Sequence, residues 1–447
     1  MKRNLRAAKR IGGTITVPGD KSIAQRAALL SIVSQGPITV VNFPRNADCL
    51  SALGAAKNLG VREEDGDDSM VLHPPTEKSV APDTIIDCGK SGTTARLLAG
   101  LVSGSTQTVI LSGDESLSRR PMRRIVEPLT AMGAKLIAVD GHLPLTVHGR
   151  KLLPFEYDLK LPSAQVKSAI LLAGLSSSCS VTIREYTPTR DHTELMVGAI
   201  GEGLSVREVK SVTEPDPVDP RKKRVSMPEP FKNEITLSSQ ARILGGTVDI
   251  PGDFSTAAFF IGAAAISGGT VTITNVGLNP TRTGLLEHLR AIGCTVQTSK
   301  RTVVSGEARG DITVTGGELK GRKIHGEAVV GLIDEIPIIA VMAAFAEGTT
   351  IIRDAGELRV KESDRLSAIA ENLRLMGVKC GVMEDGLVIE GRLEPAGADF
   401  KSFGDHRIAM AFSIASLAAV GPSTLDDDSA VGVSCPNFFD LVQKITS

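Results

Sequence analysis

The chain repeats one pattern of apolar and polar positions along its length. Each copy has a polar opening, an Ala- and Leu-rich helical stretch, an alternating strand, a polar loop and a second helical stretch. The first helical stretch, such as residues 169–175 (AILLAGL), is apolar nearly all round, which predicts a helix buried on every side. The second has one apolar stripe with spacings of 3, 4 and 3, which predicts an amphipathic helix: Leu366, Ile369, Leu373 and Met376.

The repeat is strongest between the two halves of the chain. Residues 12–22 read GGTITVPGDKS and residues 245–255 read GGTVDIPGDFS, with seven of eleven positions identical at an offset of 233. Weaker copies bring the number to six, three before about residue 240 and three after it. We therefore predict an α/β protein whose strands lie outside buried helices, although the sheet is normally the inner layer.

Length and charge narrow the class of protein. A chain of 447 residues exceeds one hydrophobic core, which predicts two domains. Its 50 basic and 51 acidic residues argue against nucleic acid and against an anionic membrane as partners. The longest uncharged run, residues 254–281, contains Gly, Ser, Asn and Pro and is not expected to span a membrane. The Pro-rich, charged stretch 212–230 predicts a solvated surface excursion near the domain junction.

The six cysteines are scattered, without a CxxC pair or a Cys/His cluster of zinc spacing. We therefore expect buried thiols, no metal site and a reducing cytoplasm. The basic N-terminus is not followed by the apolar stretch of a signal peptide.

The copies differ chiefly in the residues that open the buried helices. A helix start exposes free backbone N–H groups at the positive end of the helix dipole, so several starts facing one cleft would bind anions without net basic charge. Helix capping is the simpler interpretation of any one residue, but it does not explain the recurrence. These residues, copy by copy, are Lys21, Ser22 and Arg26; Lys90, Ser91, Gly92, Thr93 and Arg96; Ser163, Gln165 and Lys167; Asp334; and Asp405, His406 and Arg407.

Two further features favour chemistry. Lys21 aligns with Phe254 between the halves while the Pro, Gly, Asp and Ser around it are kept, so Lys21 is expected to serve chemistry rather than folding. In residues 357–366 (ELRVKESDRL), Glu362 and Arg365 lie one helical turn apart, and a surface ion pair worth about 0.3 kcal/mol is the alternative. Residues 119–124 (RRPMRR) are either a solvated basic run or an anion clamp.

Nine segments together resemble the enolpyruvyl transferases, and among them the branch that uses shikimate 3-phosphate. They run in family order across almost the whole chain: 18–27, 89–101, 113–122, 162–175, 189–194, 250–260, 334–348, 359–365 and 404–410. The sequences TRDHTE (189–194) and DEIP (334–337) resemble the bacterial class II branch, whereas Lys90 stands where the family usually has Asn and Glu357 where its class I branch has Asn.

The resemblance implies a two-domain inside-out α/β barrel, in which each domain has three βαβαββ units with buried parallel helices. Residues 18–244 would form the N-terminal domain, and residues 1–17 with 245–447 the C-terminal domain. The chain would cross between the domains twice, and the strand at 13–18 would belong with the C-terminal domain.

The resemblance also implies an enzyme of the shikimate pathway, without a metal or organic cofactor. It would transfer the enolpyruvyl group of phosphoenolpyruvate to the 5-hydroxyl of shikimate 3-phosphate by addition and elimination. Asp334 would accept the hydroxyl proton and Glu362 would handle the methylene proton, with Lys21 as the rival or partner acid. The implied ligands of shikimate 3-phosphate are Lys21, Ser22, Arg26, Ser163, Ala164, Gln165, Arg190, Asp334 and Lys361. Those of phosphoenolpyruvate are Lys21, Gly92, Arg120, Gln165, Arg365 and Arg407.

Two alternatives stay open. A UDP-N-acetylglucosamine enolpyruvyl transferase shares the fold, but that family carries a reactive loop cysteine and an Ala-Lys-Asn start in place of Lys21-Ser22. A non-catalytic repeat scaffold seldom gathers charged residues at the starts of buried helices. We expect a monomer acting on small molecules, inhibited by glyphosate because Gly92 leaves room beside the phosphoenolpyruvate site.

Overall fold

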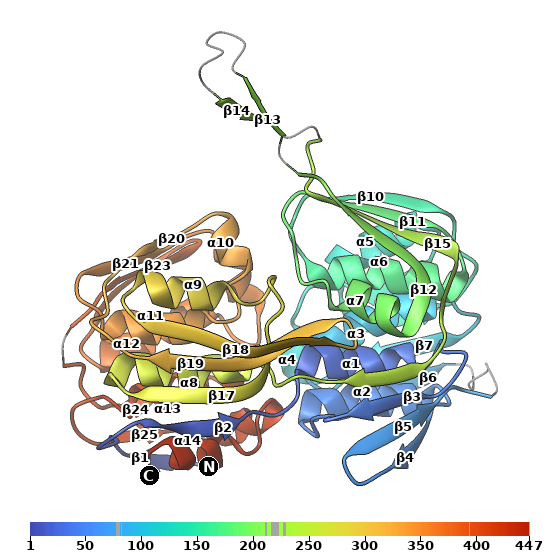
Figure 1. Ribbon diagram of the computed structural model, residues 1–447. Coiled ribbons are helices and arrows are strands. Elements are labelled where there is room, and N and C mark those ends of the chain that lie inside the picture. The colour runs from blue at the N-terminus through green and yellow to red at the C-terminus, as the bar shows by residue number, and fades with distance from the viewer. Residues whose placement is uncertain are drawn as a thin grey trace.

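The protein, as a computed structural model, consists of two lobes side by side (Figure 1). The structure describes residues 1–76, 81, 83–210, 212–215, 223–226, 229–392 and 394–446. We call the lobe drawn mainly in blue and green the N-terminal half, and the lobe drawn mainly in yellow to red the C-terminal half. Each half contains three units that combine a buried helix, an outer helix and a small sheet.

The N-terminal half holds the first three units. The first has β16 (Gly246–Asp249), α1 (Lys21–Leu30), β3 (Ile38–Val41), α2 (Ala47–Asn58), β4 (Arg62–Asp65) and β5 (Ser69–His73). The second has β6 (Thr84–Asp87), α3 (Gly92–Ser103), β7 (Thr108–Ser112), α4 (Glu115–Ser118), α5 (Arg123–Ala131), β8 (Lys135–Val139) and β9 (His142–His148). The third has β10 (Phe155–Leu159), α6 (Ala164–Ser177), β11 (Val181–Glu185), α7 (His192–Ile200), β12 (Gly201–Glu208) and β15 (Asn233–Ile243).

The C-terminal half holds the other three units. The fourth has β2 (Gly12–Thr16), α8 (Phe254–Ser267), β17 (Thr270–Gly277), α9 (Gly284–Ala291), β18 (Thr295–Val304) and β19 (Glu307–Thr315). The fifth has β20 (Lys323–Ile324), α10 (Glu327–Val330), α11 (Ile336–Ala344), β21 (Thr349–Ile352), η1 (Gly356–Val360), α12 (Arg365–Leu375), β22 (Lys379–Met383) and β23 (Gly386–Glu390). The sixth has β24 (Asp399–Phe400), α13 (His406–Ala415), β25 (Ser423–Leu425), η2 (Ser429–Val433), α14 (Phe438–Thr446) and β1 (Arg3–Leu5).

Among the described residues each of the six units has one sheet, and five of these six sheets share one topology. A parallel pair comes first and two antiparallel neighbours follow, giving the orders β16-β3-β5-β4, β6-β7-β9-β8, β10-β11-β15-β12, β2-β17-β19-β18 and β20-β21-β23-β22. The sixth sheet, β24-β25-β1, takes its antiparallel strand from the start of the chain. Within the described residues the sheets stay separate, so each half is a set of sheets around helices and not one closed barrel.

The buried helices lie inside these sheets, as the sequence pattern predicts. In α8 every residue from Phe254 to Ala265 is buried, and α11 is buried from Ile336 to Ala344. The core of each half is built from Ala, Leu, Ile and Val with few aromatic rings. The prediction of three repeat units per half with strands outside buried helices is therefore confirmed.

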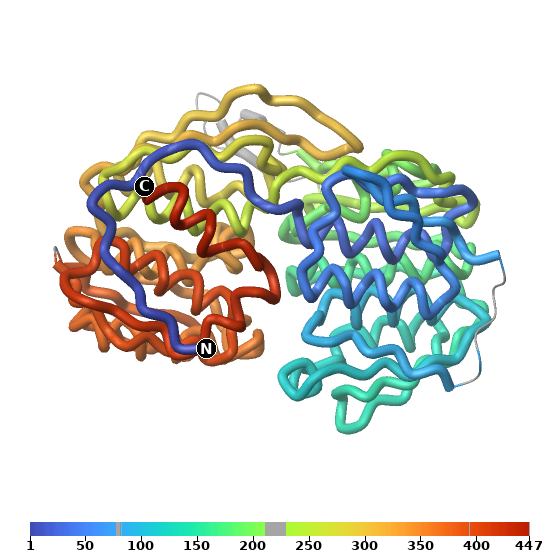
Figure 2. Tube along the Cα trace, turned by 90° about the horizontal axis from the view of Figure 1, so that it is seen from below, coloured from blue at the N-terminus to red at the C-terminus, as the bar shows by residue number. Residues whose placement is uncertain are grey.

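The chain crosses between the halves twice, through β2 and β16. Figure 2 shows the blue N-terminal segment running along the C-terminal half before it enters the N-terminal half. Strand β2 pairs with β17 in parallel, from Gly12 opposite Thr270 to Thr16 opposite Thr274. Strand β16 pairs with β3, and Ile250 belongs to the core of the N-terminal half. The domain limit at 244/245 stays a prediction, and we propose on these grounds that residues 245–250 go with the N-terminal half.

A two-stranded hairpin projects from the N-terminal half (Figure 1). Its strands are β13 (Val212–Pro215) and β14 (Lys223–Ser226), paired antiparallel. They fall within the stretch 212–230 that was predicted to be a surface excursion; residues 216–222 and 227–228 of that stretch lie outside the described residues. No helix in the described part of the chain combines the length and apolar character needed to cross a membrane.

Candidate active site

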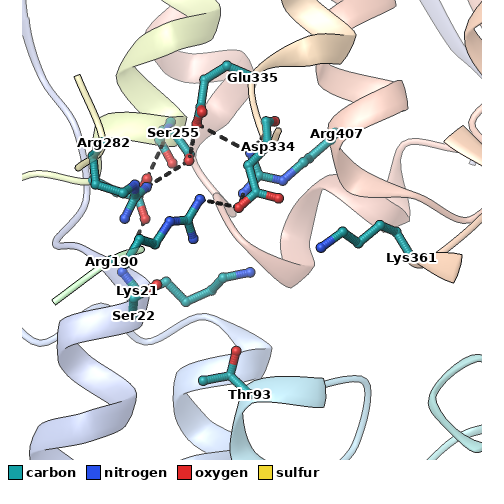
Figure 3. A network of polar contacts seen from close by, with 12 residues as sticks. Lys21, Ser22, Thr93, Arg190, Ser255, Arg282, Asp334, Glu335, Lys361 and Arg407 are labelled. Atoms are coloured by element: carbon teal, nitrogen blue, oxygen red, sulfur yellow. Dashed lines mark hydrogen bonds and ion pairs between the residues drawn. The ribbon is translucent and has the colours of Figure 1, made fainter. Parts of the chain in front are cut away.

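The candidate site lies where the buried helices of the two halves begin (Figure 3). Five of these helices are capped by the residue directly before them, whose side chain accepts a hydrogen bond from a backbone N–H of the first turn: Asp20, Ser91, Ser163, Asp253 and Asp405. The capping interpretation is therefore satisfied by these five residues. Capping therefore does not account for four residues beside these caps, which are Lys21, Gly92, Gln165 and Arg407.

Lys21 extends from the first residue of α1 and pairs with a carboxylate of α2. Its Nζ lies 2.6 Å from Asp48 Oδ2, and both side chains are largely buried. Burial lowers the pKa of Lys21 while Asp48 raises it, and the net pKa lies above the ordinary value. Lys21 is therefore a protonated ammonium group in the site. Arg407 lowers its pKa and Glu362 raises it, so both lie close to the ammonium group.

Asp334, two residues before the start of α11, is surrounded by cations from both halves. It forms an ion pair with Arg190 of the N-terminal half, and its carboxylate lies 3.7 Å from Arg365 Nη1 and 3.8 Å from Arg407 Nη2. Arg407 Nη1 also donates to the Asp334 carbonyl at 2.7 Å. Burial raises the pKa of Asp334, but Arg407, Arg190 and their neighbours outweigh it and hold the pKa well below its usual range.

Glu362 forms the second carboxylate centre. It pairs with Arg365, the first residue of α12, and its Oε1 lies 3.6 Å from Arg120 Nη1 of the N-terminal half. Burial raises the pKa of Glu362, yet Arg365 and Arg120 bring it well below its usual value. Arg365 is itself anchored by Asp405, whose Oδ2 lies 2.8 Å from Arg365 Nε. Burial, with Lys21 nearby, depresses the pKa of His406 well below its ordinary value, so the imidazole is neutral.

Gly92 opens α3 beneath two guanidinium groups. A Cβ placed on Gly92 would lie 3.2 Å from Arg120 Nη1 and 3.2 Å from Arg96 Nη1, closer than ordinary contacts. Among the described residues, Nε and Nη2 of the buried Arg120 have no hydrogen-bond partner. Arg96 Nη1 donates to Gln165 Oε1 at 2.6 Å, and Gln165 Nε2 donates to Thr93 Oγ1 at 3.0 Å. This corner therefore offers two cations, an amide and unsatisfied N–H donors to an anion.

The other candidates lie at the margin of this cluster. Lys361 Nζ is 3.4 Å from Glu357 Oε1, and Figure 3 shows the lysine reaching toward the same space as Lys21. Burial lowers the pKa of Lys361. Ser22 follows Lys21 on α1, and Ser163 and Ala164 open α6 beside Gln165.

Arg26 is held within the N-terminal half. It donates to Thr193 Oγ1 at 2.8 Å, Ser168 Oγ at 3.0 Å and the Ser22 carbonyl at 3.0 Å. Burial lowers the pKa of Arg26 to about 10, which still leaves it charged at neutral pH. Lys167, another cation at a helix start, is already paired within the same half. It is fully buried and pairs with Glu185 at 2.8 Å and Glu194 at 2.7 Å.

Sequence reasoning missed several residues that support the site. Asp48 is the counter-ion of Lys21, and Arg282 Nη1 lies 3.2 Å from Asp20 while its Nη2 donates to Ser255 Oγ at 2.8 Å. Arg282 thus joins the cap of the Lys21 helix to the start of α8, where Ser255 donates to Glu335 (Figure 3). The sequence offered one sign of this counter-ion, which is that Asp48 is an acidic residue in the first turn of α2, two residues after the Asn46 cap.

The two halves of three units have the fold of the enolpyruvyl transferases. The charged site between them, which we call the cleft, brings Arg120 and Arg190 of one half against Asp334, Glu362, Arg365 and Arg407 of the other. The chain superposes on EPSP synthase from Acinetobacter baumannii with a TM-score of 0.80 and 36% identity, covering 99% of this chain and 98% of that one. It shares the fold of the enolpyruvyl transferase NikO from Streptomyces tendae, with a TM-score of 0.72 at 17% identity over 99% and 96% of the two chains.

The family model "EPSP synthase (3-phosphoshikimate 1-carboxyvinyltransferase)" matches residues 5–228 and 221–442. A 3-phosphoshikimate 1-carboxyvinyltransferase from Solibacter usitatus is 40% identical over 100% of both chains. One from Oceanobacillus iheyensis is 41% identical over 97% of this chain and 96% of its own. The chain belongs to the EPSP synthase family.

Proposed function

We propose that this enzyme transfers the enolpyruvyl group of phosphoenolpyruvate to the 5-hydroxyl of shikimate 3-phosphate and releases phosphate. The observation that carries the proposal is the meeting of Asp334 and Glu362 with arginines from both halves in one buried cleft. Each substrate carries a phosphate and a carboxylate, and this cleft offers cations in the number that two such anions need.

Shikimate 3-phosphate binds on the N-terminal side of the cleft. The proposed ligands there are Lys21, Ser22, Arg26, Ser163, Ala164, Gln165 and Arg190, with Asp334 and Lys361 facing them from the other half. Ser163 accepts a bond from the Val166 N–H, at 3.4 Å, and its own hydroxyl hydrogen stays available for a phosphate oxygen.

Phosphoenolpyruvate binds between the starts of α3 and α12. Gly92 and Arg120 receive its phosphate, because Arg120 has unsatisfied donors and Gly92 leaves the space that a Cβ would fill. Arg365 and Arg407 receive its carboxylate, with Gln165 and Lys21 between the two substrates. In the structure, the carboxylates of Glu362 and Asp334 lie against these arginines.

Substrate binding is expected to change the pKa of Glu362, while Asp334 is ionised and ready to accept a proton. Asp334, ionised among four cations, accepts the proton of the 5-hydroxyl as the hydroxyl attacks the enol carbon. When the substrate carboxylate takes over Arg365, Glu362 loses its main cation and gains an anionic neighbour, so its pKa rises. Glu362 can then deliver a proton to the methylene carbon and remove one in the elimination step. Lys21, which is already protonated, is the partner acid.

The test is phosphate release from phosphoenolpyruvate, measured once with shikimate 3-phosphate and once with UDP-N-acetylglucosamine. We expect turnover with the first acceptor alone. Turnover with the second would favour the related transferase, and turnover with neither would overturn the proposal.

We also propose that the enzyme is a monomer of the cytoplasm. All residues of the proposed site come from one chain, and the six cysteines have free thiols. Light scattering coupled to gel filtration tests the first point, where a dimer mass would contradict it.

A further inference from the structure

Two segments face each other across the cleft on the phosphoenolpyruvate side. One is residues 116–124, which run from α4 into the first turn of α5 in the N-terminal half, and the other is residues 357–362 in the C-terminal half. Ser116 Oγ donates to the Glu362 carbonyl at 3.3 Å, and Arg120 lies 3.6 Å from the Glu362 carboxylate. One turn further on, Arg124 makes two parallel bonds to Glu357, Nη1 to Oε1 at 2.7 Å and Nη2 to Oε2 at 3.0 Å.

The Arg124–Glu357 pair differs in kind from the other contacts between these segments. Arg120 and Glu362 are proposed substrate groups, so their mutual contact is given up when the substrates bind. Arg124 and Glu357 have no such role, and their fork-to-fork geometry is the strong form of an arginine–carboxylate pair. Burial raises the pKa of Glu357, but Arg124 and then Lys361 outweigh it and lower the pKa, so the carboxylate is ionised.

Other ion pairs across the halves lie elsewhere. Two deeply buried pairs, Asp20–Arg282 and His192–Glu307, lie near the crossing strands. Lys232–Glu327, at 2.5 Å, is exposed, and within the described part of the chain it forms no ion pair with a candidate site residue. Arg190–Asp334 joins two proposed substrate groups. Among the described residues, Arg124–Glu357 is the pair that can hold the phosphoenolpyruvate side closed while substrates occupy the site.

Glu357 also reaches into the site itself. Its Oε1 accepts from Arg124 and lies 3.4 Å from Lys361 Nζ, so one carboxylate joins the N-terminal half to a proposed ligand of shikimate 3-phosphate. The carboxylate is four residues from Lys361, across the end of η1. Closing the cleft and placing Lys361 are therefore linked through one residue.

We propose that Arg124 and Glu357 are positioning residues that latch the two halves together and place Lys361 over the bound substrates. The latch contributes to substrate binding and not to the chemical step. This inference rests on the proposed function for its kinetic test, but the latch also predicts a property of the unliganded protein.

The kinetic test is a double-mutant cycle of Arg124→Met, Glu357→Gln and the double variant. Each single variant should raise KM for both substrates about three- to tenfold while kcat stays within about twofold. Because both changes break one pair, the double variant should match Glu357→Gln and not multiply the two effects. The matched control is Lys232→Met with Glu327→Gln, which should leave KM within about twofold.

A second readout uses no substrate. Small-angle scattering of the unliganded Arg124→Met protein should show a larger radius of gyration than the wild type, with the midpoint of urea unfolding unchanged. A multiplicative double variant, a loss confined to kcat, or an equal effect from the rim pair would overturn the latch. If the wild type did not turn over phosphoenolpyruvate with shikimate 3-phosphate, the proposed function would be contradicted. The scattering result would still test the latch.

Discussion

At the residue scale, the protein's own carboxylates lie against the arginines that are proposed to bind the substrates' anions. Asp334 and Glu362 neutralise Arg190, Arg365 and Arg120, so binding exchanges protein carboxylates for substrate carboxylate and phosphate. This exchange explains how a chain with a formal charge of −1 can bind two polyanions, because the site's arginines are balanced by the protein's own carboxylates until substrate anions replace them.

The first prediction concerns Lys21 and Glu362. Lys21→Ala and Glu362→Ala should each lower kcat by at least about two orders of magnitude, because each removes a proton-transfer group. Steady-state phosphate release measures the loss. Glu115→Ala, which removes a carboxylate from an exposed pair with Arg119, is the matched control and should stay near wild type. Near-normal kcat in Lys21→Ala or Glu362→Ala would remove that residue from the mechanism.

The second prediction concerns the space beside Gly92. In Gly92→Ala the new Cβ would lie 3.2 Å from the guanidinium groups of Arg120 and Arg96, so both must shift. We expect KM for phosphoenolpyruvate to rise. Inhibition by glyphosate, which should compete with phosphoenolpyruvate in the wild type, should weaken further. Inhibition curves at several phosphoenolpyruvate concentrations give both values. Unchanged glyphosate inhibition in Gly92→Ala would refute the placement of this site.

At the element scale, helix α9 carries a histidine that resists protonation. Burial, with Arg322 nearby, lowers the pKa of His288 to about 4. Between about pH 6.5 and 4 the unfolded chain therefore binds a proton at His288 and the folded chain does not. The free energy of unfolding should fall as the pH drops through this range, by up to about 3 kcal/mol from this residue. Urea unfolding at several pH values measures the slope. His288→Gln should make this slope shallower, with the rest coming from groups such as His406 whose pKa is also depressed, and an equal slope in the variant would exclude His288 as a source.

The elements also show how far the sequence could predict the site. The residues that open the helices were found because the repeat aligns them, and their caps Asp20, Ser91 and Asp405 lie where the polar openings predicted. Counter-ions such as Asp48 and Glu357 were not found as partners. Their pairing depends on how helices of different units and halves pack against one another. The spacing of residues along a short stretch of sequence does not predict such packing.

The sheets set a similar limit. The strand expected at 13–18 in the C-terminal half is observed as β2, at 12–16, and pairs there with β17. That β1 completes the sixth sheet could not be predicted, because Arg3–Leu5 is too short and polar to show alternation. The alternation of polar and apolar residues along a strand does not show which distant strand it pairs with.

At the scale of the whole molecule, ion pairs close the cleft on one side and buried pairs hold the crossing strands on the other. Arg124–Glu357 and Arg120–Glu362 are partly open to solvent, whereas His192–Glu307 and Asp20–Arg282 are almost fully buried. Salt screens exposed charges much more than buried ones, with a Debye length of about 10 Å at 0.1 M and about 3 Å at 1 M. Raising the salt should therefore open the cleft while the crossings hold.

The radius of gyration of the unliganded protein, measured by small-angle scattering, should increase between about 0.05 and 0.5 M NaCl. With saturating amounts of both substrates it should stay constant, because the anions then bridge the halves through the buried arginines. Arg124→Met should remove much of the salt dependence by opening the cleft already at low salt. A radius that rises equally with and without substrates would place the salt-sensitive contacts outside the cleft.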